Sequence, residues 1–189
     1  MALFATLAFL AACGHVPMAS IERLSKVDML QTDPAAIRIA VAYPDALRVP
    51  RQGAKLEFAA RVENATNDLV KKTFTLVPDR SESERAELAG LLKPGTRLEI
   101  FRLSNRDVQD MRSIQRRLTA LKQTKGKAVK GSMDVSLAGC ESSTPPAGPI
   151  PVSTFIKTAE LGEYITLLRN YDIRKVITGP DAVATHDCI

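Results

Sequence analysis

The chain has no tryptophan, and aromatic residues make up only 5% of its 189 residues. Its core must therefore be mainly aliphatic. Histidine is also scarce: only His15 and His186 are present, so the side chain most often used for general acid–base catalysis is nearly absent. The sequence contains no phosphate-binding loop, dinucleotide fingerprint or nucleophile elbow. These absences favour a non-enzymatic function, and we expect neither a cofactor nor a metal ion.

Long apolar runs are absent after residue 12, and none approaches the roughly 20 residues of a membrane-spanning helix. The composition is that of a globular protein, with 45% hydrophobic and 25% charged residues. A chain of this length can bury one hydrophobic core, and no repeat or linker divides it. We therefore expect a single domain, over residues 35–189, that does not cross a membrane.

The first apolar run is short. Residues 2–12 carry no charge, and the run ends in Leu10-Ala11-Ala12-Cys13. A short run closed by small residues is typical of a secretory signal, and this tetrapeptide resembles the lipobox of bacterial lipoproteins. The resemblance implies that residues 1–12 are a signal peptide that is removed, and that Cys13 is fatty-acylated and anchors the mature chain. The alternative is an N-terminal helix in which Cys13 is a small core residue.

The resemblance also implies a location in the bacterial cell envelope, facing the periplasm. Gly14 follows the cysteine, where some lipoproteins retained at the inner membrane have Asp, so the outer membrane is favoured. In an oxidising compartment Cys140 and Cys188 can form a disulfide that persists. We predict this bond, and the chain-entropy description gives it roughly 4 kcal/mol of stabilisation.

A second interpretation is a small hydrolase or a metal-binding protein in which His186 acts with Cys140 or Cys188. Two thiolates and one imidazole leave a fourth zinc position open, and the chain has no close-spaced Cys-x-x-Cys pair. A structural disulfide is therefore the preferred interpretation. The substitution His186→Ala separates the two, because only the second predicts that an activity or a metal is lost.

Residues 13–34 are polar and mixed, and we predict a tether between anchor and domain, although apolar residues spaced by three also suit a short amphipathic helix there. Ser81 and Ser104 are helix-capping signals that open helices ending near residues 92 and 122. Because the predicted strands gather as hairpins, we expect an α+β fold, a mainly antiparallel sheet with two helices packed on one face. Period-two alternation and turn signals place the strands at residues 37–43, 54–63, 69–77, 97–103, 129–137, 152–157 and 164–168.

The second predicted helix and the residues after it are strongly basic. Residues 111–130 hold seven basic residues and no acid, whereas the whole chain has a net charge of +5. The basic residues are Arg112, Arg116, Arg117, Lys122, Lys125, Lys127 and Lys130. One interpretation is a solvated face whose charge complements the helix dipole. The other is a contact with an anionic partner.

An anionic partner would be lipid headgroups, an envelope glycan or an acidic protein. Nucleic acid is not expected, since no aromatic residues are interleaved with the basic ones. The acidic residues between Asp79 and Glu87 are interpreted as complementing the dipole of the first helix rather than as a calcium site. Together these features predict a lipid-anchored envelope protein that acts as a binding or scaffold module. This prediction requires Arg112, Arg116 and Arg117 to be exposed and not paired with acids.

Overall fold

The structure is a computed structural model that describes residues 17–45, 47–49, 52–62, 68–125, 129–137, 140–141 and 148–173. The predicted signal peptide and the acylation site Cys13 lie outside the described residues, as do Cys188 and both histidines. Cys140 is described only as part of a strand. The predicted disulfide and the interpretation based on His186 therefore stay predictions.

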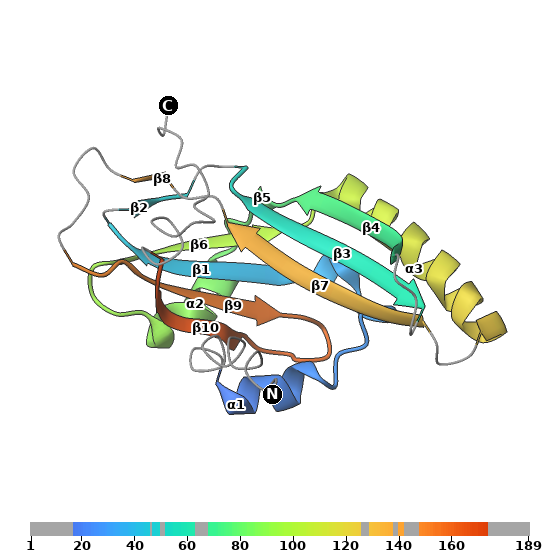
Figure 1. The fold of residues 1–189 in the computed structure, drawn as a ribbon. Helices are drawn as coiled ribbons and strands as arrows, with labels where there is room; N and C mark the ends of the chain where they lie inside the picture. Colours follow the sequence, from blue (N-terminus) through green and yellow to red (C-terminus); the bar gives the residue numbers. More distant parts are fainter. Residues whose placement is uncertain are drawn as a thin grey trace, which may run out of the picture.

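The described strands form three antiparallel sheets (Figure 1). The largest has the order β10 (Ile165–Asp172), β9 (Pro151–Lys157), β1 (Arg38–Pro44), β6 (Thr96–Arg102), β5 (Val77–Pro78). The second has the order β4 (Asp68–Thr75), β3 (Ala54–Val62), β7 (Val129–Leu137), and the short strands β2 (Leu47–Arg48) and β8 (Cys140–Glu141) form the third. The helices are α1 (Met18–Leu24), α2 (Glu82–Leu88) and α3 (Asn105–Lys125), with short 3₁₀ turns η1 (Pro34–Ala36) and η2 (Ala89–Leu91). The predicted α+β class with antiparallel sheets is confirmed.

The three-stranded sheet buries one face, as the alternation in its sequence predicts. In β3, Leu56 and Phe58 are fully buried, whereas Lys55 and Arg61 are exposed. β7 alternates in the same way and pairs with β3 along its whole length, from Val62 opposite Val129 to Ala54 opposite Leu137. One wet face and one buried face are typical of antiparallel sheets.

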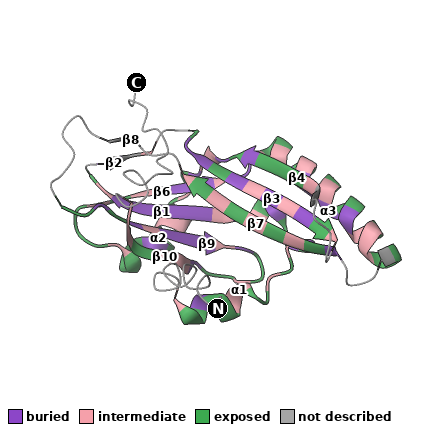
Figure 2. Ribbon diagram, viewed as in Figure 1, coloured by how far each residue is buried: buried purple, intermediate pink, exposed green. Residues whose placement is uncertain are grey.

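The five-stranded sheet is buried on both faces, which its sequence alone does not show. β1 is buried along most of its length (Figure 2), and its alternate residues enter two separate hydrophobic clusters. Ile39 and Val41 belong to the cluster that includes the inner face of β3 and the apolar stripe of α3. Ala40 and Ala42 belong to a smaller cluster with Leu88 of α2. α2 therefore packs on one face of this sheet, whereas α3 contacts β7 of the three-stranded sheet (Figure 1), so the two helices do not pack together on one face.

Part of the expected tether belongs to the folded domain. Residues 18–24 form α1, and the following segment reaches the core through Leu30 and Pro34, which are buried. Arg23 of α1 pairs with Glu163 at 2.6 Å, which holds the helix against the turn between β9 and β10. Within the described residues the domain thus begins near residue 18 rather than at residue 35.

Both predicted helix caps form. Ser81 accepts a hydrogen bond from the amide of Glu84, and Ser104 accepts one from the amide of Asp107 at 3.1 Å. Each hydroxyl satisfies one of the amides that a helix start leaves unpaired. The turn between β9 and β10 contains Gly162, which has a φ of 70°, a conformation that glycine adopts without steric strain.

Candidate anion-binding surface

The candidate surface is the outer side of α3, whose inner side is fixed by core packing. Along the apolar stripe of α3, Val108, Met111 and Leu118 are buried in the larger cluster, and Ile114 and Leu121 pack against it. These residues recur every three or four positions and define one face of the helix. Burial of this stripe directs the exposed side chains of Arg116 and Arg117 away from the core.

Gln115 is the one polar residue of the buried stripe, and it ties α3 to the segment of residues 28–36. Its side-chain amide donates to the carbonyl oxygens of Met29 at 3.0 Å and of Thr32 at 2.9 Å. Only 7% of Gln115 is exposed. Buried polar groups need partners, so this side chain both satisfies two backbone acceptors and sets the position of the segment beside the helix.

Arg112 does not meet the condition that it be unpaired. Its guanidinium donates to a carboxylate oxygen of Asp33 at 2.8 Å, and the two side chains are 39% and 47% exposed. The hydrogen bond from Arg112 holds the pKa of Asp33 below its usual value of 3.8, and the amide of Ala35 acts in the same direction. The charge of Arg112 is thus largely neutralised within the domain.

A second acidic side chain fixes the same segment from the other side. The hydroxyl of Thr32 donates to Glu160, in the turn between β9 and β10. Burial alone would raise the pKa of Glu160, but the hydrogen bonds from Thr32 and Thr158 keep it below its usual value of 4.5. Residues 28–36 are therefore held between α3 and this turn.

Arg116 and Arg117 are the residues of the predicted basic set that meet the full condition of being exposed and not paired with acids. Both are exposed, and neither forms an ion pair with the described part of the chain. Lys122 lies 3.6 Å from a carboxylate oxygen of Asp28, and Lys130 is exposed on β7 and has an interaction of its own. Lys127 and the side chain of Lys125 lie outside the described residues.

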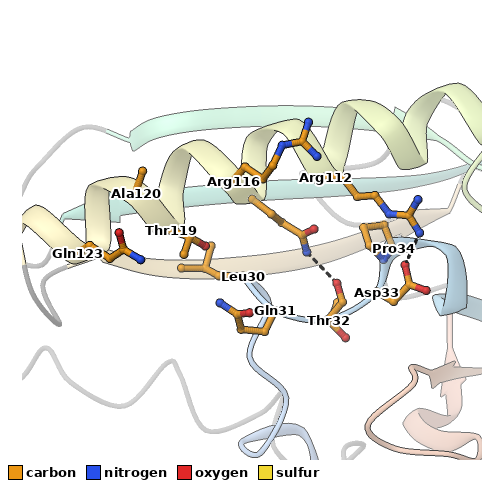
Figure 3. A pocket seen from close by; sticks show the side chains of 11 residues that line it. Leu30, Gln31, Thr32, Asp33, Pro34, Arg112, Arg116, Thr119, Ala120 and Gln123 are labelled. Atoms are coloured by element: carbon orange, nitrogen blue, oxygen red, sulfur yellow. Dashed lines mark hydrogen bonds and ion pairs between the residues drawn. The ribbon is translucent and has the colours of Figure 1, made fainter.

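A polar groove of about 520 Å³ lies between α3 and residues 30–34 (Figure 3). Arg112 points toward Asp33 in this view, whereas Arg116 points away from the segment. The sequence did not indicate the groove, because its two walls are far apart in the chain. Besides the arginines and Gln115, the lining residues are Leu30, Gln31, Thr32, Asp33, Pro34, Thr119, Ala120 and Gln123.

A cluster of charged side chains lies on the α2 side of the five-stranded sheet. Arg38 contacts Asp79 at 2.8 Å, and Lys157 contacts Glu84 at 3.2 Å and Glu87 at 2.6 Å. Arg38 and Lys157 are cross-strand neighbours in β1 and β9, so Asp79 and two acids of α2 cover this basic pair. These acids were expected only to complement the dipole of the helix, but three of them also form ion pairs with Arg38 or Lys157.

The protonation of this cluster follows from its burial and its pairing. Burial alone would lower the pKa of Lys157, but the hydrogen bonds from its ammonium to Glu87 and Glu84 raise the pKa above its usual value of 10.5. Burial raises the pKa of the neighbouring Tyr164 phenol, and the nearby Glu84 carboxylate adds to that effect. The ammonium of Lys157 thus stays charged and the phenol of Tyr164 stays neutral near neutral pH, as a structural network requires.

The described residues hold no group of three or more His, Cys, Asp or Glu side chains arranged to bind a metal ion. Among the same residues, no helix has the length and apolar character needed to cross a membrane. Comparisons of the chain with protein-family models, with curated proteins and with solved structures gave no match.

Proposed function

We propose that this protein is a lipid-anchored component of the bacterial envelope that binds an anionic glycan along α3 without catalysing a reaction. The observation that carries the proposal is the pair Arg116 and Arg117, which are exposed and have no ion-pair partner in the described part of the chain. Their basic neighbours Arg112 and Lys122 are paired with acids. Arginine suits carboxylate and phosphate groups because its planar guanidinium can donate two parallel hydrogen bonds.

The groove favours a glycan over a flat lipid surface. It is a shallow, open groove, and amide and hydroxyl groups of Gln31, Thr119 and Gln123 line it beside Arg116. Such groups both donate and accept hydrogen bonds, which matches the hydroxyl groups of a sugar. A lipid bilayer presents a flat array of headgroups and would use the arginines but not the groove.

The test is binding of polygalacturonate, an anionic polysaccharide, to the full-length chain carrying Cys13→Ala. The variant Arg116→Gln/Arg117→Gln should bind roughly fivefold more weakly, since exposed charges contribute about 0.2–1 kcal/mol each. Raising the salt concentration should weaken binding further. The matched control is Lys55→Gln/Arg61→Gln on the outer face of β3, which removes two exposed positive charges elsewhere.

The proposal fails if the two double variants lose affinity equally, because the effect would then come from net charge alone. It also fails if neutral dextran binds as well as polygalacturonate, or if anionic vesicles bind the chain while polygalacturonate does not.

The anchor is tested separately by fractionating cells. The unsubstituted protein should sediment with membranes, and Cys13→Ala should move it to the soluble fraction, because each buried methylene of an acyl chain contributes roughly 0.8 kcal/mol. Native protein that retains residues 1–12 would contradict acylation at Cys13.

A further inference from the structure

A second hollow, separate from the groove beside α3, lies on the α2 side of the five-stranded sheet. It is at the end of β1 opposite to the charged cluster. β1 runs from Arg38, in the cluster, to Pro44 at the far end. Leu88 of α2 packs with Ala40 and Ala42, which lie in the middle of the strand. Beyond Leu88 the chain turns through η2 to Lys93, and a hollow of about 370 Å³ lies between this turn and the strands.

The floor of this hollow is apolar. Ala42 and Phe155 are buried members of the smaller hydrophobic cluster, and Leu92 packs against that cluster. Leu91 also lines the hollow and is 53% exposed, one of the few large apolar side chains left in solvent in the described structure. A concave apolar surface of a few hundred Å³ with a few polar groups is the usual form of a small-molecule site.

The charge of the lining is entirely positive. Lys93 and Arg169 line the hollow, and no carboxylate does. Both are exposed, and neither forms an ion pair with the described residues. An apolar floor with two unpaired cations and no acid is complementary to a molecule with an apolar body and an anionic group.

The backbone of β10 is distorted where it meets this hollow. Leu168 pairs with Thr154 and Tyr171 pairs with Val152, so Arg169 and Asn170 together oppose one residue, Ser153. Asn170 has a φ of 48°, and its amide donates to the hydroxyl of Ser153 at 2.9 Å.

Such a bulge redirects side chains, and bulges and left-handed residues occur preferentially at functional sites. Here the bulge brings Arg169 and Asn170 to the hollow. A regular β10 would place only one residue opposite Ser153.

We propose that this hollow binds a single-chain anionic amphiphile, a fatty acid carboxylate, with its alkyl chain on Phe155 and Leu92 and its carboxylate between Lys93 and Arg169. The site is independent of the α3 surface, because the hollow and the groove beside α3 have no lining residue in common.

The test is calorimetric titration of the full-length Cys13→Ala chain with dodecanoate below its micellar concentration. Dodecanol, which has the same chain without the charge, should bind roughly tenfold more weakly. The variant Lys93→Gln/Arg169→Gln should lose about the same factor for dodecanoate and little for dodecanol. The control Lys55→Gln/Arg61→Gln removes the same number and kinds of charge outside the hollow and should leave dodecanoate binding unchanged.

A second variant fills the hollow without disturbing the core. A side chain at Gly90 would meet no atom within 4 Å of its first carbon, so Gly90→Leu should be accommodated and should displace the alkyl chain. Gly148→Leu is the matched control, since Gly148 is equally open but does not line the hollow. Absence of dodecanoate binding, equal affinity for dodecanol, or equal effects of the two leucine variants would each overturn the proposal.

Discussion

The substitution Gln115→Leu tests how residues 28–36 are held. Leucine is close to glutamine in size and is a good helix former, so α3 itself should tolerate it. It cannot donate a hydrogen bond, however, and Gln115 donates to both Met29 and Thr32. The substitution therefore removes two contacts between the segment and the helix while preserving the apolar packing around them.

The magnitude follows from the burial of the two acceptors. The hydrogen bond to Thr32 is buried and the one to Met29 is partly buried. A buried group left without its partner destabilises a protein by about 1–3 kcal/mol, and a typical hydrogen bond contributes about 0.5–1.5 kcal/mol. Allowing for the apolar surface that leucine buries, we expect the free energy of unfolding to fall by roughly 2–3 kcal/mol. For a chain of this size that lowers Tm by roughly 5–10 °C.

The assay is urea denaturation followed by circular dichroism, with amide hydrogen exchange to locate the effect. Exchange should accelerate in residues 28–36 more than in β3. Gln123→Leu, an exposed position on the same helix, is the control and should change stability by less than about 0.5 kcal/mol. Equal stability of the Gln115→Leu and Gln123→Leu proteins would refute the role given to Gln115.

The charged cluster predicts that Asp79→Ala lowers the free energy of unfolding, measured in urea, by about 2–4 kcal/mol, because the mostly buried Arg38 then keeps only the more distant Glu84, at 4.0 Å, as a carboxylate partner. The pKa of Lys157 is raised, so its ion pairs stabilise the fold fully below pH 10.5 and that contribution is lost as the pH rises through the folded-state pKa. Lys157→Met should abolish this alkaline loss of Tm. The pKa of Asp33 is lowered from 3.8, so its contribution is present above that pH and is lost in more acidic solution, and Asp33→Asn should flatten the acid side of a Tm-against-pH curve. Reducing agent should lower the stability of the exported protein by roughly 4 kcal/mol if Cys140 and Cys188 are bonded, and should have no effect on Cys140→Ser.

The local sequence pattern was sufficient to predict a helix or strand where one face of that element is exposed to water. The alternation in β3 and β7 predicted both strands and the face that each buries, since a period of two separates two environments. Ser81 and Ser104 predicted where α2 and α3 begin, because capping depends on neighbouring residues only.

The local sequence pattern was insufficient where the structure of a segment depends on a packing partner far along the chain. The length of β10 was underestimated, because its bulges at Leu167 and at Arg169 and Asn170 break the period of two. The segment before β1 was predicted to be a tether, because nothing in its own sequence shows that Gln115 donates hydrogen bonds to its carbonyl oxygens.

The sequence by itself determined the concentration of positive charge between residues 111 and 130, since a count of side chains needs no fold. Only the tertiary structure decided which of those charges remain available. Arg112 is separated from Asp33 by 79 positions and lies 2.8 Å from it, whereas Arg116, one turn further along α3, has no carboxylate partner among the residues that the structure describes. Coulomb attraction depends on distance in space and on local solvent, and the chain sets that distance only by packing α3 against residues 28–36.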